Sequence, residues 1–240
     1  DWAVVKDSFP DPIEVELEYG PDGYPTIESC LKKSFANYYL SYDVSKSFDN
    51  LYRNVNGVGD AFAEFWRRAA EFFKDEENVV GYELINEPWF GDVYDDWWAG
   101  IADGYANKYN FQPFYRKLHD SIRTVDNETL IFFEASPFDQ VGVGFTEGPG
   151  GPEYNDRQVF SYHIYCGAND AIGDPVNPTV CWVADTVSNY VHLSAAERLG
   201  TGSFLTEFGA YTNSSKAINE IDWVTNYADE HFQSWAYWQF

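Results

Sequence analysis

Basic residues are scarce in this chain, which carries 15 Lys and Arg against 39 Asp and Glu in 240 residues, for a formal net charge of −24. A surface this acidic repels the phosphates of nucleic acids and the headgroups of anionic lipids. We therefore expect no nucleic acid partner and no electrostatic docking to membranes. Long hydrophobic runs are also missing, since none approaches the roughly 18 apolar residues that cross a bilayer.

Methionine is absent altogether, the chain opens at Asp1, and it stops at Phe240 inside a run that is typical of a strand. These ends predict a piece of a longer protein, in which any signal peptide would lie outside the sequence. Cysteine is nearly absent: Cys30, Cys166 and Cys181 make an odd count. One thiol is therefore expected to be left over or to pair outside the chain.

Two Asn-X-Ser/Thr sequons begin at Asn127 and Asn213. Glycosylation acceptors, together with cysteines that flank a Pro- and Asn-rich loop, are typical of an oxidising compartment. The sequence therefore favours a protein that is secreted or that works in a lysosome-like lumen. It leaves the oligomeric state open.

Short apolar strands alternate with helices over most of the chain. Pro and Gly break the first sixty residues into an expected extended loop region. Helical spacing of apolar residues then predicts helices over residues 61–74, 113–125, 183–199 and 216–232. Strands are predicted over residues 79–86, 129–134, 158–165, 203–208 and 234–240.

This alternation predicts an α/β fold with a parallel sheet covered by helices. The long loops follow strands, as they do on the active-site face of a (β/α)8 TIM barrel. A doubly wound sheet would also alternate, but its glycine fingerprint is missing. We expect a partial barrel with about strands 4–8, lacking the first three strands. Residues 1–240 would then be the C-terminal portion of one TIM-barrel catalytic domain.

Two glutamates stand at the carboxyl ends of predicted strands, where side chains from different sectors of a barrel converge on one pocket. Glu87 follows the first strand, and Glu207 ends the fourth. Pro88 is expected to keep Glu87 extended. Hydrolysis of a glycosidic bond with retention uses two carboxyl groups about 5–5.5 Å apart. A single glutamate of this kind is commonly solvated or ion-paired, but two in one predicted barrel favour catalysis.

Aromatic residues are abundant, at 19% of the chain with 9 Trp, 18 Tyr and 19 Phe. Most of these rings are expected to fill the core. The excess favours a groove in which rings stack on the apolar faces of sugars.

Four segments resemble glycoside hydrolase family 5, a family of retaining enzymes in the cellulase-like (β/α)8 superfamily. They occur in the family's order: Gly81-Tyr82-Glu83-Leu84-Ile85-Asn86-Glu87-Pro88, Ser161-Tyr162-His163-Ile164-Tyr165, Leu205-Thr206-Glu207-Phe208-Gly209 and Trp235-Ala236-Tyr237-Trp238. The resemblance implies that Glu87 is the acid/base and Glu207 the nucleophile. It further implies that Asn86 bonds the sugar 2-hydroxyl, and that His163 or, in preference, Tyr165 hydrogen-bonds Glu207.

The same resemblance implies that Trp238 forms a stacking floor for the sugar. Glu134 also ends a strand and either lines the site or makes a structural ion pair. Trp2 is a further candidate for stacking on the substrate. We expect no cofactor, because no His, Cys, Asp and Glu group has convincing metal spacing. His119, His192 and His231 lie in helical stretches and are expected at the surface.

Within the family, the chain is most similar to endoglycoceramidases and the related glucosylceramidases, which release a glycan or a glucose from ceramide. The similarity lies in the Asp1-Trp2-Ala3 opening, the Glu-Leu-Ile-Asn-Glu-Pro-Trp stretch and Tyr-His-Ile-Tyr-Cys. It implies a glycolipid or oligosaccharide substrate and a Cys166–Cys181 disulfide, with Cys30 pairing upstream.

An apolar loop after the acid/base would suit a ceramide aglycone and a transient contact with a lipid surface. Its rings are Trp89, Phe90, Trp97 and Trp98, for which helix packing is the alternative role. Two other functions stay open: a β-1,4-glucanase or mannanase that acts on polysaccharide, and a catalytically silent sugar-binding fragment. Because five of eight strands leave open sheet edges, we expect the longer protein to be active and these 240 residues alone to be inactive.

Overall fold

The computed structural model describes residues 17–32, 39–137, 144–167 and 174–239. In this part of the chain five strands form one sheet in sequence order, and every neighbouring pair is parallel. The strands are β1 (Gly81–Glu83), β2 (Leu130–Glu134), β3 (Gln158–Ile164), β4 (Gly202–Gly209) and β5 (Ser234–Trp238). Helix α6 (Gln112–Arg123) lies in the connection between β1 and β2, α7 (Pro178–Leu199) in that between β3 and β4, and α8 (Ser215–Glu230) in that between β4 and β5. The chain thus forms a partial (β/α)8 barrel, and the predicted fold class is confirmed.

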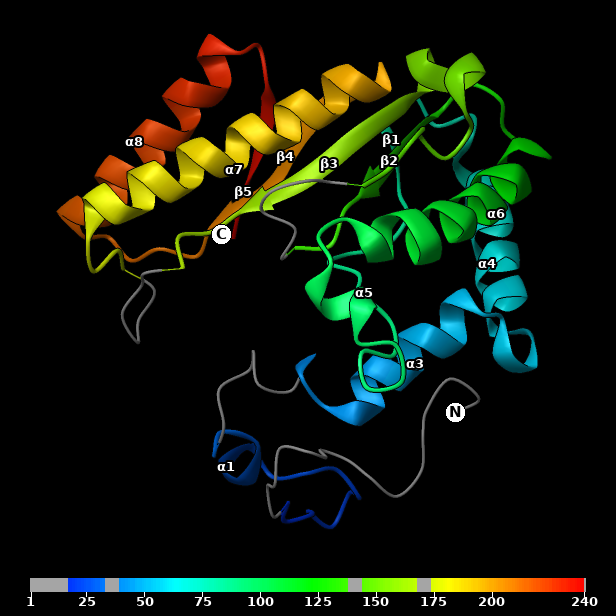
Figure 1. Cartoon of the computed structure of the whole chain (residues 1–240), viewed down its shortest axis with the longest axis horizontal. Helices are drawn as coiled ribbons and strands as arrows, with labels where there is room; N and C mark the ends of the chain where they lie inside the picture. Colours follow the sequence, from blue (N-terminus) through cyan, green and yellow to red (C-terminus); the bar gives the residue numbers. More distant parts are fainter. Residues whose placement is uncertain (1–16, 33–38, 138–143, 168–173, 240) are drawn as a thin grey trace.

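Helices cover the outer side of this sheet (Figure 1). The helices in the described part of the chain are α1 (Ile27–Cys30), α3 (Tyr42–Tyr52), η1 (Val55–Gly57), α4 (Val58–Phe73), α5 (Trp98–Ile101), η2 (Asn107–Phe111), α6 (Gln112–Arg123), η3 (Pro152–Arg157), α7 (Pro178–Leu199) and α8 (Ser215–Glu230). Helix α7 packs on β3 and β4, α8 packs on β5, and α4 packs against α6. Within the described ranges, no helix has the length and apolar character needed to cross a bilayer.

The expected extended region is wrong for part of the first sixty residues, because α3 occupies residues 42–52. The hydroxyl of Ser41 accepts a hydrogen bond from the backbone N–H of Val44 and so caps the helix. Val44, Phe48 and Leu51 then pack against the core at helical spacing. The prolines and glycines that suggested a loop all lie before this helix.

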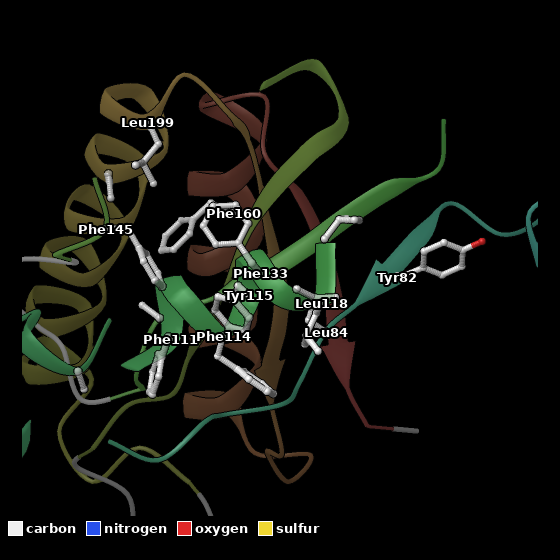
Figure 2. Packing of buried hydrophobic residues seen from close by; sticks show 14 of the residues in the cluster. Tyr82, Leu84, Phe111, Phe114, Tyr115, Leu118, Phe133, Phe145, Phe160 and Leu199 are labelled. Carbon is white, nitrogen blue, oxygen red and sulfur yellow. The ribbon is translucent and has the colours of Figure 1, made fainter. Parts of the chain in front are cut away.

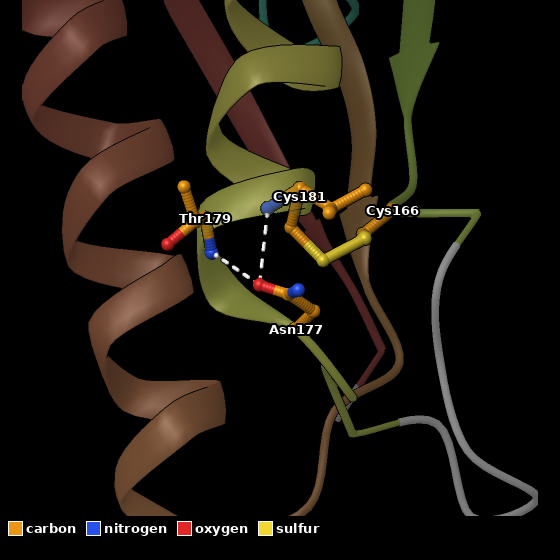
Figure 3. The surroundings of a disulfide bond; sticks show 5 residues. Cys166, Asn177, Thr179 and Cys181 are labelled. Atoms are coloured by element: carbon orange, nitrogen blue, oxygen red, sulfur yellow. Dashed lines mark hydrogen bonds between the residues drawn. A yellow bond between two sulfur atoms is a disulfide. The ribbon is translucent and has the colours of Figure 1, made fainter.

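Two other elements have boundaries that differ from the predicted ones. Helix α7 begins at Pro178 instead of residue 183, because the Asn177 side chain accepts hydrogen bonds from the N–H groups of Thr179 and Val180 (Figure 3). Strand β1 covers only residues 81–83 of the predicted 79–86, although Leu84 still donates one hydrogen bond to the backbone oxygen of Phe132. Glu87 therefore lies four residues beyond the end of the strand.

Aromatic rings fill the space between the sheet and its helices (Figure 2). Phe133 of β2 and Phe160 of β3 have ring centroids 5.5 Å apart, and both contact Phe145. Tyr115 of α6 joins the same cluster, and all four rings are almost fully buried. Burial of each ring contributes on the order of 2–3 kcal/mol, so this layer fixes β2 and β3 against α6.

The expected surface position is wrong for two of the three histidines. His119 is 3% exposed and packs against Tyr154, and His192 is 6% exposed. The His192 ring lies parallel to that of Tyr162 at 4.8 Å. Burial lowers the pKa of His192 to about 4, so this imidazole stays neutral in the core. His231 is exposed, as expected.

A disulfide joins Cys166, just after β3, to Cys181 in the first turn of α7, and the pairing expected from the family resemblance is confirmed (Figure 3). Both cysteines are buried. Cys30 lies in α1 and takes no part in this bond. The disulfide therefore ties the carboxyl end of β3 to the helix that covers it.

Two carboxyl groups meet in the core between α7 and α8. Asp185 is 2% exposed and Glu220 3%, and each has one buried carboxyl oxygen without a hydrogen-bond partner. Burial, then the hydrogen bond and charge of Glu220, raise the pKa of Asp185 to about 9. The folded protein thus holds a proton that an unfolded aspartate, with a pKa of about 4, releases.

Between those two pKa values the folded state binds more protons than the unfolded state, so its free energy of unfolding falls as pH rises. We expect Asp185→Asn, whose amide can still donate to Glu220, to flatten this fall. At pH 8 the variant should be more stable than the wild type by about 1–3 kcal/mol. Thermal unfolding of the full natural chain that carries these residues, measured from pH 5 to pH 8, tests this. Parallel pH curves for the two proteins would contradict it.

Candidate active site

Alternate residues of the strands point to opposite faces, and the inner face changes from apolar to charged towards the carboxyl ends. Phe132 and Phe204 meet on the inner face with ring centroids 5.8 Å apart. Gly81 leaves space for the Phe132 ring, which a Cβ at that position would strike. Beyond this apolar layer lie glutamates from three sectors and one histidine, with residues such as Tyr162 and Phe208 facing the helices instead.

A register shift brings the two central strands into line at this level. Tyr162 of β3 pairs with Leu205, but His163 pairs with Glu207, so Thr206 is skipped. Such an irregularity redirects the side chains that follow it. As a result, Glu207 lies beside His163 on the inner face.

Glu87 reaches this layer from a turn, and its expected extended conformation is wrong. Its φ is +42°, a region that residues other than glycine rarely adopt. Its backbone N–H donates a 3.0 Å hydrogen bond to Oε2 of Glu134. Pro88 disfavours helical backbone at the preceding residue but does not decide its conformation here, because this longer-range contact competes with the local preference.

His163 lies at the centre of the carboxylates. Its Nδ1 is 2.9 Å from Oε1 of Glu87, and 3.8 Å from one oxygen each of Glu134 and Glu207. Burial alone lowers the pKa of this imidazole, but the hydrogen bond to Glu87 and the charges of Glu134 and Glu207 outweigh it and raise the pKa to about 9. This shift favours the protonated imidazole at neutral pH.

Tyr165 is the residue that hydrogen-bonds Glu207. Its hydroxyl donates to Oε1 of Glu207 at 2.6 Å. Burial, then this hydrogen bond and the charge of Glu207, raise the pKa of Tyr165, so the phenol keeps its proton and remains a donor. His163 instead hydrogen-bonds Glu87. The two residues predicted as partners of Glu207 therefore contact different glutamates.

Trp238 ends β5 opposite Gly209 in the register. Trp235 and Tyr237 contact Phe208 on the helix side, so alternation puts Trp238 on the inner face, where it is 46% exposed. Gly209 has a φ of +126°, and a Cβ there would meet the backbone oxygen of Trp238. The close approach of β4 and β5 next to the nucleophile candidate thus requires glycine.

The other predicted site residues differ in their placement. Asn86 is exposed beside Glu87. Glu134 is 2% exposed, and burial raises its pKa to about 8 against the opposing effects of His163 and the Glu87 N–H. Trp2 lies outside the described residues.

Among the residues that the structure describes, two groups of ligand atoms are close enough to hold a metal ion. One contains Glu83, Glu134 and His163, the other Glu87, His163 and Glu207, and in each group the ligand atoms lie within 4.8 Å of one another. Both groups share His163, whose raised pKa favours a protonated ring over a metal ligand. The expectation of no cofactor therefore stays a prediction.

Sequence reasoning missed two residues at this site. Glu83 lies on the inner face of β1, within the first of these groups. Tyr39 packs against Trp89, and burial and the charges of Glu87, Glu134 and Glu207 raise its pKa. Alternation along β1 could have identified Glu83, whereas no sequence signal links Tyr39 to a site formed by later strands.

The loop after Glu87 is fastened to α3 and η2. The indole N–H of Trp89 donates to Ser45 Oγ at 2.9 Å, and Tyr52 donates to the backbone oxygen of Trp89 at 2.6 Å. Asn110 donates to the backbone oxygen of Phe90 at 2.6 Å. These contacts hold the backbone that leads away from Glu87.

The predicted apolar surface on this loop is only half correct. Trp89 and Phe90 are buried at 3% and 8% exposure, so their rings pack inside the protein. Trp97 and Trp98 are 54% and 50% exposed, and their rings stack at a centroid distance of 4.4 Å. The exposed apolar surface therefore lies at α5, ten residues beyond the acid/base candidate.

A model of the family described as Cellulase (glycosyl hydrolase family 5) matches residues 37–240. The chain belongs to glycosyl hydrolase family 5. The family expected from the four motifs is thus confirmed. The region that matches the family model includes all five strands of the described sheet.

Relatives within the curated proteins include two endoglycoceramidases. The protein from Hydra vulgaris is 38% identical over 246 residues, covering 100% of this chain and 44% of the relative. The protein from Cyanea nozakii is 36% identical over 242 residues, covering 99% and 45%. The chain thus spans a little less than half the length of these relatives.

Solved structures support the fold. Endo-glycoceramidase II from Rhodococcus sp., in complex with a five-membered iminocyclitol, superposes with a TM-score of 0.75 at 23% identity. The match covers 99% of this chain and 50% of that one. The five parallel strands therefore correspond to about half of that enzyme's structure.

An ion pair joins α3 to the loop after Glu87. Lys46 of α3 is 2.9 Å from Asp92, whose side chain is 4% exposed. We expect Lys46→Met to leave a buried carboxylate without its cation and to lower the free energy of unfolding by about 1–3 kcal/mol. Denaturant unfolding of the full natural chain measures this. The exposed Lys74 provides the control, since Lys74→Met should change stability by less than about 0.5 kcal/mol; equal effects of both variants would refute the role of the pair.

Proposed function

We propose that this chain belongs to a retaining β-glycosidase that hydrolyses the bond between glycan and ceramide in glycosphingolipids, with Glu87 as acid/base and Glu207 as nucleophile. The observation that carries the proposal is the approach of these two side chains. One oxygen of each lies within 4.8 Å of the other, with His163 beside both. Retaining enzymes place their carboxyl groups about 5–5.5 Å apart, whereas inverting enzymes leave about 6.5–9.5 Å for a water.

In the first step, a carboxylate oxygen of Glu207 attacks the anomeric carbon while Glu87 gives its proton to the departing glycosidic oxygen. The bond to ceramide breaks and a glycosyl ester on Glu207 forms. In the second step, Glu87 takes a proton from water, whose oxygen displaces Glu207 and releases the glycan. Tyr165 would hold the Glu207 oxygen in line, and Trp238 and Asn86 would bind the sugar.

The proposed substrate rests on the relatives and on the apolar surface. The relatives at 36–38% identity are endoglycoceramidases, and structures of the Rhodococcus enzyme include a complex with ganglioside GM3 and a lactosyl-enzyme intermediate. In this chain, a pocket of about 320 Å³ lies between α5 and the loop after Glu87, lined by Leu40, Trp89, Phe90 and residues 99–103. Apolar lining of this kind suits an alkyl chain.

A second candidate is a β-1,4-glucanase or mannanase. The family description names cellulases, and an endoglucanase, Cel5A from Pseudomonas stutzeri, superposes with a TM-score of 0.56 at 23% identity. Such enzymes need an open groove lined by several stacking rings, whereas the stacked and exposed pair Trp97 and Trp98 lies at α5. A catalytically silent sugar-binding protein is the third candidate, and the presence of both glutamates argues against it.

We also propose that residues 1–240 are the C-terminal part of one barrel domain and that the protein works in a secretory or lysosome-like lumen. The Cys166–Cys181 disulfide supports an oxidising compartment. Asn127 and Asn213 of the two sequons are exposed, so both could accept a glycan.

The direct test is an assay of the full natural chain on lactosylceramide and on carboxymethyl cellulose. We expect release of intact lactose from the glycolipid and no cleavage of the polymer. Glu87→Gln and Glu207→Gln should each lower the rate by at least about 10³-fold, since each removes a group that transfers a proton or forms the covalent bond.

Other results would change the proposal in distinct ways. Cleavage of carboxymethyl cellulose alone would keep the mechanism and refute the glycolipid substrate. Release of glucose from glucosylceramide alone would favour the exo-acting relatives. Full activity in either glutamine variant would refute the assignment of that glutamate.

The exposed rings at α5 predict a separate effect on glycolipid in vesicles. We expect Trp97→Ala and Trp98→Ala to raise KM for lactosylceramide in phosphatidylcholine vesicles by about 5- to 30-fold, because each removes roughly 1–2 kcal/mol of apolar contact. A water-soluble aryl lactoside should be cleaved normally. Trp182→Ala is the control, since Trp182 is 49% exposed on α7, a helix that lies apart from α5 in Figure 1. Equal KM values in all three variants would refute a lipid contact at α5.

A further inference from the structure

Glu134 is the most deeply buried carboxyl group of the site, and its contacts lead to Glu87. Only 3% of its side chain is exposed, and Oε2 accepts the backbone N–H of Glu87 at 3.0 Å. The backbone oxygen of Glu134 accepts the hydroxyl of Tyr115 at 2.8 Å, so α6 fixes this end of β2. A sugar hydroxyl would find little of this carboxyl group accessible.

The Glu87 backbone needs an outside contact of this kind. A φ of +42° is unfavourable for any residue with a Cβ, and the proline that follows adds its own restriction. Conformations of this type are unfavourable and persist only where the surroundings impose them. The hydrogen bond that the Glu87 N–H donates to Oε2 of Glu134, on a neighbouring strand, supplies such a contact at the residue itself.

Glu134 also acts on the partner of the Glu87 side chain. Its Oε1 is 3.8 Å from Nδ1 of His163, the atom that lies 2.9 Å from Oε1 of Glu87. The charge of Glu134 is among the causes that raise the pKa of His163. Glu134 thus acts on Glu87 in two ways. It accepts a hydrogen bond from the Glu87 backbone, and it contacts the His163 imidazole that lies beside the Glu87 carboxyl group.

We propose that Glu134 is a positioning residue, which orients the Glu87 carboxyl group for protonation of the leaving oxygen by holding the Glu87 backbone and His163. This inference rests on the proposed glycosidase function and replaces a direct role of Glu134 in substrate binding. A purely structural glutamate would stabilise the barrel without any preference for the protonation step.

Leaving groups of different basicity distinguish these two roles. Ceramide departs as a basic alkoxide and needs the proton of Glu87, whereas dinitrophenolate departs without one. Since kcat/KM reports formation of the glycosyl-enzyme, a misplaced acid should affect only the first substrate. A displacement of about 1 Å can cost on the order of 10²-fold in rate.

The experiment measures kcat/KM of the full natural chain on lactosylceramide and on dinitrophenyl β-lactoside. Glu134→Met removes the acceptor at similar volume, and we expect an about 10- to 100-fold loss on lactosylceramide with less than about 3-fold loss on the aryl lactoside. Glu134→Gln keeps an oxygen for the Glu87 N–H and should recover most of the lost rate at its own pH optimum.

Equal losses on both substrates in Glu134→Met, or no loss on either, would overturn the proposal. If that variant does not fold, Glu134→Ala is measured in its place: equal losses on the two substrates overturn the proposal, and a loss confined to lactosylceramide supports it. Glu76→Gln, at an exposed glutamate after α4, controls for loss of a charge. A wild type that cleaves neither substrate would refute the glycosidase function itself and the positioning role with it, a result distinct from any pattern among the variants.

Discussion

The contact of one imidazole with three carboxyl groups is the constraint on which the site depends. Nδ1 of His163 lies within 4 Å of Glu87, Glu134 and Glu207, which come from three different parts of the chain. Three carboxylates this close would repel one another, and each would resist ionisation. A cation between them, with a pKa of about 9, offsets that repulsion and allows a nucleophile and an acid to share a small volume. The strands must therefore hold His163 in a fixed position among the three carboxyl groups.

Much of this arrangement follows from residues that the sequence already displays. Glu87 and Glu207 could be identified because parallel strands bring their carboxyl ends together, and the motifs around them added the family. The backbone conformation of Glu87 could not be predicted, because its φ depends on a contact with Glu134, which lies 47 positions away in the sequence. The register shift that skips Thr206 and aligns Glu207 with His163 could not be predicted either, because the alternation of side chains along a strand assumes an unbroken register. Local rules predicted which strands exist, but not the register that makes a site of them.

Helix α7 shows a different failure of pattern reasoning. Its buried face is largely polar, with Asp185, Asn189 and His192, whereas Val183, Val187 and Tyr190 are exposed. A rule that places apolar residues inward therefore puts His192 at the surface. The polar residues are tolerated in the core because most of them find partners: Asn189 accepts from Tyr162, and Nδ1 of His192 lies 2.7 Å from the backbone oxygen of Ser188.

The polar buried face of α7 helps to position the active-site residues of β3, on which this helix packs. Tyr162, which donates to Asn189 and packs flat on His192, is the last residue of β3 before the register shifts. Four residues further on, the disulfide fastens the same strand to the start of α7. His163 and Tyr165, which contact the two catalytic candidates, lie between these attachments. Hydrogen bonds are directional where apolar packing is not, so a polar helix face can fix the rotation of a strand as well as its depth. The polar core behind β3 thus gives the imidazole and the phenol the fixed positions that the three carboxyl groups require.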